Sequence, residues 1–334
     1  MTTRSAKSRI PLKNKIDVAL RVARSGTGPL FASLFVTRKC NCNCSYCRSI
    51  RQPFTDISLD EWEKVIDRLF GWGVRIFSLT GGEPLSRPDI ADIVSCITKR
   101  RRGVCWMISN FKSMDRRMVD VLHSAGLQFI TCSLDSLEEN GDKSSGRVFD
   151  ILQYARSRGI VASTLTVVTE DNIRDVPALA REVVSRGIAF DMGLYQHVGG
   201  AFSPSDTEQK PRSMAQVKQL RKFLRNLKIT TGLVSPSMSY LGEDIVLYDK
   251  MGWKCPADSD RFLVVNNDGT LMPCQEYAGS VRVLDIDSLS DVRWRESKRT
   301  AVQSCKGCFY GCYYQKCHIT PLDALFDAYT LLRT

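Results

Sequence analysis

The sequence predicts an α/β fold with a mainly parallel sheet, followed by a small cysteine-rich domain. Three observations lead to this prediction. Short apolar runs alternate with amphipathic segments from residue 29 to about residue 196, which is the pattern of strand–helix units in a parallel sheet. Glycines stand where several of these helices should end. From residue 253 onward the periodicity fades and the cysteine density rises, as expected where metal organises the fold.

The predicted strands are the apolar runs at residues 30–36, 75–79, 105–109, 129–134, 161–168 and 188–195. The predicted helices lie between them, at residues 58–71, 87–99, 114–125, 146–158 and 174–186. The first helix opens with a capping-box pattern, Ser58 to Glu61. Six strands in this order could form an open barrel or a doubly wound sheet, and periodicity alone does not choose between them.

The rest of the chain is less regular. A helix is predicted at 214–227, and Asp268-Gly269 predicts a hairpin turn that presents Cys274 on its second strand. The expected organisation is an N-terminal extension, the α/β domain, a connecting segment with a helix, the cysteine-rich domain and a C-terminal helix, at residues 1–28, 29–196, 197–252, 253–320 and 321–334.

Composition narrows the class of protein. A chain of 334 residues can bury a large core without metals or disulfides, so its thirteen cysteines need another explanation. No apolar run approaches the roughly 18 residues of a membrane span, and the basic N-terminus lacks the apolar stretch of a secretory signal. We therefore expect a cytoplasmic protein with no membrane partner. In the reducing cytoplasm, clustered cysteines bind metal more often than they form disulfides. The basic run at 99–102 falls where a helix should end, which favours a solvated helix terminus over a nucleic-acid site.

The first cysteine group follows the first predicted strand. Cys40, Cys44 and Cys47 have the spacing C-x3-C-x2-C, and three such thiolates can bind three irons of a [4Fe–4S] cubane. A zinc knuckle with Cys42 as the fourth ligand is the alternative. The second strand is followed by Gly-Gly-Glu-Pro at 81–84, where two glycines let the backbone approach a ligand closely. Both loops would lie at the carboxyl ends of parallel strands, where ligands bind.

Together these motifs resemble the radical S-adenosylmethionine (SAM) superfamily, and the resemblance covers most of the chain. It implies a partial (β/α)6 barrel in which Cys40, Cys44 and Cys47 bind a [4Fe–4S] cluster whose open iron is chelated by SAM. It assigns SAM contacts to Tyr46, Gly81, Gly82, Glu83, Asn110 and Ser133. Phe111 departs from the Thr-Asn-Gly that the family often has after the third strand. Lys143 and Arg147 are candidate partners of the SAM carboxylate.

The second cysteine group comprises Cys255, Cys274, Cys305, Cys308, Cys312 and Cys317. This region resembles the SPASM and twitch domains of many radical SAM enzymes, and Cys255, Gly269 and Cys274 match their opening pattern. The later spacing, C-x2-C-x3-C-x4-C, departs from the full SPASM pattern. The resemblance implies at least one auxiliary [4Fe–4S] cluster, with structural zinc as the alternative. Cys312 and Cys317 are candidate ligands and candidate hydrogen-atom donors.

The resemblance implies an enzyme that reductively cleaves SAM to a 5′-deoxyadenosyl radical, which takes a hydrogen atom from a small metabolite, sugar or peptide. Epimerisation, dehydrogenation, decarboxylation and peptide maturation are the expected outcomes, and flavodoxin or ferredoxin is the expected reductant. Only 39 residues precede Cys40, too few for an independent leader-binding module. This favours a metabolite, or a peptide recognised without that module.

Two other functions remain open at this point. The formal charge of +11 suggests an RNA-modifying member of the same superfamily, although no nucleic-acid module is recognisable and nucleic acid is not the expected partner. A non-enzymatic zinc or iron–sulfur protein, for binding or for electron transfer, is the other alternative. In that interpretation the Gly-Gly-Glu-Pro loop has no purpose.

Overall fold

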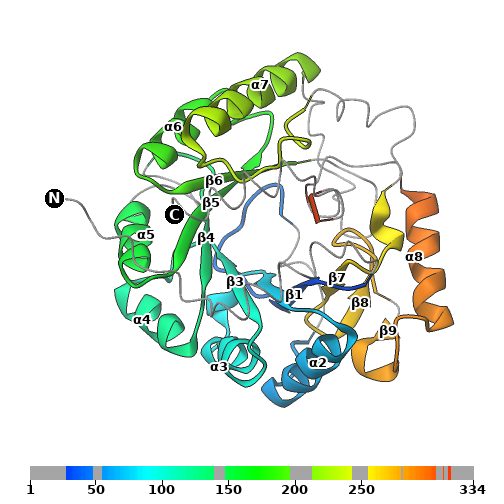
Figure 1. The fold of residues 1–334 in the computed structure, drawn as a ribbon. Coiled ribbons are helices and arrows are strands. Elements are labelled where there is room, and N and C mark those ends of the chain that lie inside the picture. Colours follow the sequence, from blue (N-terminus) through cyan, green and yellow to red (C-terminus); the bar gives the residue numbers. More distant parts are fainter. Residues whose placement is uncertain are drawn as a thin grey trace.

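The computed structural model describes residues 28–47, 55–138, 147–195, 213–242, 255–279, 281–305, 311 and 315–316. Within these residues one sheet has the strand order β6-β5-β4-β3-β2-β1-β7-β8-β9 (Figure 1). Its first six strands in the chain are β1 (Phe31–Thr37), β2 (Ile76–Gly81), β3 (Val104–Ser109), β4 (Phe129–Ser133), β5 (Val161–Val168) and β6 (Ala189–Leu194). Neighbours among these six strands all pair in parallel. A doubly wound sheet would reverse its strand order, so the structure confirms a partial (β/α)6 barrel.

Helices cover the outside of this curved sheet (Figure 1). They are α2 (Leu59–Trp72), α3 (Ile90–Ser95), α4 (Arg116–Ala125), α5 (Val148–Ser157) and α6 (Val176–Ser185), and a π-helical turn, η3 (Cys96–Arg100), continues α3. The predicted capping box is present, because the Ser58 hydroxyl accepts from the Glu61 amide at 3.2 Å. No described helix combines the length and the apolar character needed to cross a membrane.

The two faces of the strands differ in polarity. The face toward the helices carries the apolar core, which includes Cys96, Cys105 and Cys132. The inner face carries a row of polar groups. The Ser33 and Ser78 hydroxyl oxygens lie 3.3 Å apart, and Thr131 Oγ1 lies 2.6 Å from both the Trp106 indole nitrogen and Ser163 Oγ. Because side chains alternate between faces along a strand, this polar row lines the interior of the barrel.

The C-terminal part extends the same sheet. Strand β7 (Phe262–Val265) pairs in parallel with β1, and β8 (Thr270–Met272) and β9 (Val281–Arg282) follow in antiparallel pairing. The predicted hairpin turn is present, with Gly269 at a φ of 81°. The placement of Cys274 on the second strand was wrong, since β8 ends at Met272 and Pro273 has no amide hydrogen to continue the ladder.

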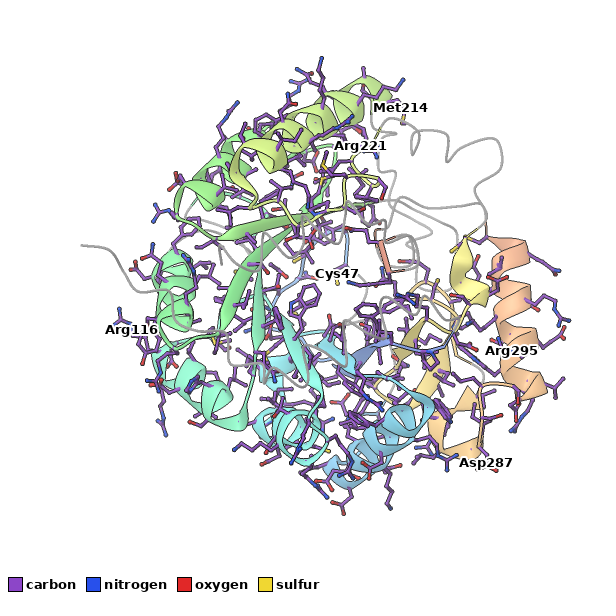
Figure 2. All side chains as sticks on the ribbon, in the orientation of Figure 1. Cys47, Arg116, Met214, Arg221, Asp287 and Arg295 are labelled. Atoms are coloured by element: carbon purple, nitrogen blue, oxygen red, sulfur yellow. The ribbon has the colours of Figure 1, made fainter. Side chains whose placement is uncertain are left out.

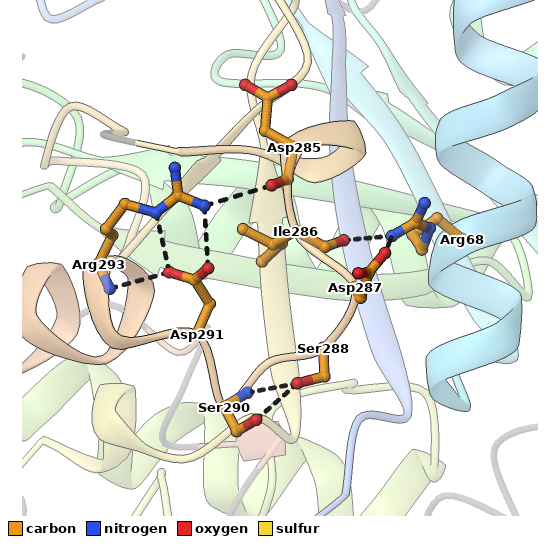
Figure 3. Close-up of polar contacts among 8 residues, drawn as sticks. All are labelled: Arg68, Asp285, Ile286, Asp287, Ser288, Ser290, Asp291 and Arg293. Atoms are coloured by element: carbon orange, nitrogen blue, oxygen red, sulfur yellow. Dashed lines mark hydrogen bonds and ion pairs between the residues drawn. The ribbon is translucent and has the colours of Figure 1, made fainter.

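Helix α2 and the β9–α8 connection hold each other through polar contacts (Figure 3). Arg68 of α2 donates to the Ile286 carbonyl and to Asp287, the latter at 3.1 Å. Asp291 caps helix α8 (Val292–Ser304) by accepting from the Arg293 amide at 2.9 Å, while the Arg293 guanidinium also binds the Asp291 carboxylate. The C-terminal region is therefore fastened to the barrel both by the sheet and by α2.

The basic run at residues 99–102 has partners within the protein. Arg100 forms an ion pair with Glu63, and Arg101 forms one with Asp67, both on α2. The side chains of Lys99, Arg100 and Arg102 are exposed, so the predicted solvated helix terminus is confirmed, and two of the four cations form ion pairs at the surface. Helix α7 (Met214–Thr231) confirms the predicted helix at 214–227 and continues for one more turn. The C-terminal helix, nearly all of the N-terminal extension and residues 197–212 and 243–252 of the connecting segment lie outside the described residues.

Arg87 ties the end of β1 to the rest of the barrel. It is 7% exposed, and its Nη1 donates to the Val36 and Ile57 carbonyls at 2.9 and 3.1 Å. It also pairs with Asp89 at 2.7 Å. Arg87→Met would leave buried acceptors and a partly buried carboxylate without partners. We expect it to lower the free energy of unfolding by about 3 kcal/mol in denaturant titrations. Arg68→Met, at an exposed pair, should change it by less than about 1 kcal/mol.

Candidate functional site

The predicted site residues gather where β1, β2, β3 and β4 end. The loop after β1 carries Cys40, Cys44 and Cys47, all half-buried, while Cys42 is 7% exposed. Cys47 lies within the ring of strands in the view down the barrel (Figure 2). The loop is tightened locally, since the Cys47 amide donates to the Cys44 carbonyl at 3.0 Å. Three cysteines therefore remain accessible as ligands, and the fourth is turned into the protein.

This donor set fits a cluster better than a single ion. Among the described residues, no three histidine, cysteine, aspartate or glutamate side chains converge in the way one metal ion requires. A cubane bound through three different irons holds its thiolates farther apart than one ion would. A zinc knuckle would need Cys42 as its fourth ligand, and Cys42 is more buried than the other three cysteines of the loop.

The two glycines after β2 are in close contact with the beginning of the cysteine loop. The Gly82 amide donates to the Thr37 carbonyl, and the Glu83 amide donates to the Lys39 carbonyl, both at 2.7 Å. A Cβ on Gly81 would lie 2.2 Å from the Thr37 oxygen, and one on Gly82 would lie 2.1 Å from the Lys39 oxygen. Gly81 also has a φ of 134°, which favours glycine. Both positions therefore need glycine so that the cysteine loop can be hydrogen-bonded from below.

Glu83 is almost fully buried and joins β2 to β3. Its carboxylate accepts from the Ser109 hydroxyl at 2.8 Å, from the Asn110 amide at 2.7 Å and from the Leu85 amide at 3.1 Å. Charge-assisted bonds of this kind are the strong ones. The structure thus gives Glu83 a scaffolding role, and the predicted SAM contacts of Gly81, Gly82 and Glu83 stay predictions.

Asn110 connects the end of β3 to the cysteine loop. Its Nδ2 donates to Asn41 Oδ1 at 2.7 Å and approaches Cys40 Sγ at 3.8 Å. The next residue, Phe111, has a φ of 62° and is 3% exposed. The backbone therefore takes the left-handed conformation that suits the family's glycine, although a phenylalanine stands there, at a cost of about 1 kcal/mol.

Tyr46 is held by the end of β4. Its hydroxyl donates to the Asp135 carboxylate, whose other oxygen accepts from the Val167 amide of β5 at 2.8 Å. The Tyr46 and Tyr195 ring centroids lie 5.8 Å apart. Burial first, and then the charge and hydrogen bond of Asp135, raise the pKa of Tyr46 well above its usual range, so the tyrosine stays neutral. Ser133 ends β4 two residues before Asp135 and is half-buried.

Arg38 lies at the base of the cysteine loop and is 6% exposed. Its Nε donates to Asn266 Oδ1 at 2.9 Å, and its guanidinium carbon lies 4.4 Å from the centre of the Phe35 ring. Burial lowers the pKa of Arg38 to about 10, and the negative charges of Asp268 and Cys47 act in the opposite direction. At neutral pH it is a buried cation at the base of the cysteine loop.

Three of the second group of cysteines also come together. Cys255 and Cys274 pack against the same small apolar cluster, together with Val302 of α8. Cys305 follows the last residue of α8, and its amide donates to the Ala301 carbonyl at 3.0 Å. Burial raises the pKa of Tyr277, and the neighbouring Cys305 and Cys274 contribute in the same direction. These contacts gather three predicted auxiliary ligands, whereas Cys308, Cys312 and Cys317 lie outside the described residues.

A buried ion pair positions this second group. Asp260 follows the turn that begins after Cys255, and it pairs with Lys298 at 3.0 Å and with Arg295 at 2.6 Å on α8. Lys298 is 1% exposed, so burial lowers its pKa, while Asp260 opposes that shift. The pair holds the segment after Cys255 against the helix that ends at Cys305.

Sequence reasoning did not find several residues that build the site. These residues form hydrogen bonds between distant segments, which hydrophobic periodicity cannot predict. They are Arg38, Asn41, Asp135 and Glu83, the last in its scaffolding role. One available signal was a charged residue directly at the end of an apolar strand. Of the two candidates for the SAM carboxylate, Arg147 lies exposed at the start of α5, and Lys143 lies outside the described residues.

Comparison with known proteins defines the class of this barrel. Residues 34–183 match the model of the radical SAM superfamily, which spans the cysteine loop, the Gly-Gly-Glu-Pro loop and the β3 and β4 ends. The part of the chain that forms the barrel is therefore similar to proteins of the radical SAM superfamily.

Individual relatives agree with this assignment. The chain is 30% identical to Fe-coproporphyrin III synthase of Methanosarcina barkeri over 154 residues, which are 43% of this chain and 38% of the relative. It is 27% identical to PqqA peptide cyclase of Gluconobacter oxydans, over 72% of this chain and 68% of that one. The chain spans about two fifths of the length of the first curated relatives it matches.

A solved structure shares the fold over nearly the whole chain. SuiB of Streptococcus suis, in a crystal structure with the precursor peptide SuiA, has a TM-score of 0.65 and 15% sequence identity. The alignment covers 94% of this chain and 80% of SuiB. At this identity the likeness shows the fold alone, and it includes the C-terminal extension of the barrel.

The close approach at Gly82 predicts a selective loss of cluster binding. In Gly82→Ala the new methyl would have to displace the Lys39 carbonyl, so we expect the cysteine loop to shift. After anaerobic reconstitution the variant should hold about one cluster fewer than the wild type, measured as iron and sulfide content. Gly71→Ala is the matched control, because a Cβ there has no neighbour within 4 Å. Equal iron content in both variants would contradict this account of the loop.

The ion pair between Asp260 and Lys298 predicts that loss of the carboxylate lowers stability more than loss of the ammonium does. Asp260→Asn leaves the buried Lys298 ammonium without its carboxylate and should lower the free energy of unfolding by about 3 kcal/mol. Lys298→Met leaves Asp260 paired with Arg295 and should cost about 1 kcal/mol. Denaturant titration of both variants checks the order, and a larger loss in Lys298→Met would show that the pair is not what holds this region.

Proposed function

We propose that the protein is a SAM-cleaving enzyme that acts on a peptide through hydrogen-atom abstraction. The observation that carries the proposal is the three-cysteine loop with Cys42 buried, at whose start the Thr37 and Lys39 carbonyls accept from the Gly82 and Glu83 amides. Such a loop presents three thiolates and leaves one iron of a [4Fe–4S] cluster for SAM.

The residues of the site have different roles in holding the cluster and SAM. When bound, the cluster and SAM supply an electron and the 5′-deoxyadenosyl radical. Cys40, Cys44 and Cys47 would hold the cluster, and Asn110 would orient Cys40 through its contact with the sulfur. Neutral Tyr46, fixed by Asp135, would form an apolar wall beside SAM. Glu83 keeps the β2 and β3 ends together so that Gly81, Gly82, Asn110 and Ser133 face the same space.

The second cysteine group supports an auxiliary [4Fe–4S] cluster held by Cys255, Cys274, Cys305 and Cys308. The packing of Cys255 and Cys274 on one apolar cluster, and the approach of Tyr277 to Cys274 and Cys305, support this ligand set. Cys312 and Cys317 remain candidates for a further partly open cluster or for hydrogen-atom donation, and Cys312→Ala and Cys317→Ala separate these roles by product yield.

A peptide is the favoured substrate for two reasons. The sequence similarity that extends over two thirds or more of both chains is to a PqqA peptide cyclase, and the SuiB structure was solved with a precursor peptide. The barrel interior offers partly exposed polar groups for a peptide backbone, including Ser78 and Ser163. Lys316 lies 5.0 Å and 5.4 Å from the Phe31 and Trp106 rings, so the C-terminal region reaches the same interior. A cytoplasmic location and reduction by flavodoxin or ferredoxin complete the proposal.

The test is SAM cleavage under anaerobic conditions. The protein is reconstituted with iron and sulfide, reduced with dithionite and given SAM, and 5′-deoxyadenosine is measured by chromatography. We expect product from the wild type and at least a hundredfold less from the triple variant Cys40→Ala, Cys44→Ala, Cys47→Ala. Cys42→Ala is the matched control, because it removes a buried thiol from the same loop, and it should keep its iron and its activity.

Two outcomes would count against the proposal. If the wild type takes up zinc without sulfide, the first cysteine group is a structural zinc site. If Cys42→Ala loses iron as completely as the triple variant does, Cys42 is a ligand and the three-thiolate arrangement is wrong. A peptide substrate is tested separately, by whether candidate precursor peptides raise the yield of 5′-deoxyadenosine above the rate without substrate.

A further inference from the structure

The base of the cysteine loop contains a charged residue that the proposed function does not use. Arg38 follows Thr37, the last residue of β1, and precedes Cys40 by two positions. It is 6% exposed, whereas the adjacent Lys39 is exposed. Two neighbouring cations thus precede Cys40, one inside the protein and the other, which is nearer in sequence, in solvent.

The partners of Arg38 come from the opposite end of the chain. Its Nε and Nη2 both donate to Asn266 Oδ1, and Nη2 approaches Met272 Sδ at 3.8 Å. Asn266 follows β7 and Met272 ends β8. Arg38 is therefore bound by the β7–β8 hairpin, which leads to Cys274. A planar guanidinium bound in this way has a fixed orientation.

The same hairpin turn makes a second contact with the base of the loop. Asn267 Nδ2 donates to Asp56 Oδ1, and the Thr37 hydroxyl donates to Asp56 Oδ2, both at 2.7 Å. The Ile57 amide also donates to the Asn267 carbonyl at 2.9 Å. The chain entering the cysteine loop at Thr37 and the chain returning at Asp56 are therefore bridged by one turn of the C-terminal region.

We propose that Arg38 is a positioning residue that anchors the cysteine loop to the β7–β8 hairpin and makes the SAM-binding cluster easier to reduce. The inference rests on the proposed function, since it concerns the cluster held by Cys40, Cys44 and Cys47. One-electron reduction adds a negative charge to the cluster. A fixed positive charge in a region of low dielectric stabilises that reduced state, and charge and hydrogen bonding around a cluster set its potential.

The electrostatic part of the argument depends on burial. Arg38 is buried at the base of the loop, two residues before Cys40, and the Asp268 carboxylate of the hairpin turn acts on its charge. The exposed charge of Lys39 is screened by water and salt, so its effect on the cluster should be small. Burial, and not closeness in sequence, should then decide which of the two cations changes the reduction potential of the cluster.

The experiment is a potentiometric titration of the reconstituted full-length protein, followed by electron paramagnetic resonance. The signal that changes when SAM is added identifies the cluster of the first cysteine group. Arg38→Gln should lower the equilibrium constant for its reduction about tenfold, a shift of about 59 mV for a one-electron couple. Arg38→Lys keeps the charge and should shift it less. Lys39→Gln is the matched control and should leave the potential unchanged.

A further variant keeps the inference testable if Arg38→Gln does not load iron. Asn266→Ala keeps the cation and removes its anchor, and it should lower the potential by a smaller amount than Arg38→Gln. An unchanged potential in Arg38→Gln, or equal shifts in Arg38→Gln and Lys39→Gln, would overturn the inference while leaving SAM cleavage intact. If Arg38→Gln loads no iron, an unchanged potential in Asn266→Ala would overturn it. A wild type without any cluster would overturn both the inference and the proposed function.

Discussion

The site depends on one close approach of two backbone segments. The residues after β2 lie directly beneath the start of the cysteine loop, with two amide-to-carbonyl bonds of 2.7 Å. This approach leaves no room for a Cβ at Gly81 or Gly82. These bonds fix the position of the Cys40 end of the loop relative to the barrel. The side chains of Glu83, Asn110 and Tyr46 lie around it. The shape of the site is therefore determined mainly by backbone geometry, and side-chain hydrogen bonds orient the individual groups around it.

Much of this arrangement was predictable, because local patterns carry it. Strand and helix positions follow hydrophobic periodicity, and the barrel elements agree with the predictions to within a few residues. The Gly-Gly-Glu-Pro and cysteine motifs located the site because each directly follows a strand. The hydrogen bonds of Arg38 and Tyr46 could not be predicted in this way. They join residues 228 and 89 positions apart, and only the register of the folded sheet brings such residues together.

The departures from expectation have simple physical causes. Phe111 takes a left-handed backbone despite its side chain, because its burial and the neighbouring hydrogen bonds of Ser109 and Asn110 outweigh about 1 kcal/mol of strain. Cys274 lies beyond β8 because a proline precedes it. At Phe111 burial and hydrogen bonds overrode a backbone preference, whereas at Cys274 a neighbouring proline ended the strand.

The pairing of β7 with β1 has a consequence for how the chain folds. Strand β1 is the first strand of the barrel, yet it lies inside the sheet between β2 and β7. During synthesis the six barrel strands emerge well before β7, so one edge of β1 stays unpaired until more than two hundred further residues have been made. That edge is apolar and unprotected, which is the usual setting for wrong pairing between chains. The barrel and the cysteine-rich region should therefore mature together, and fragments that end after β6 should aggregate when expressed alone.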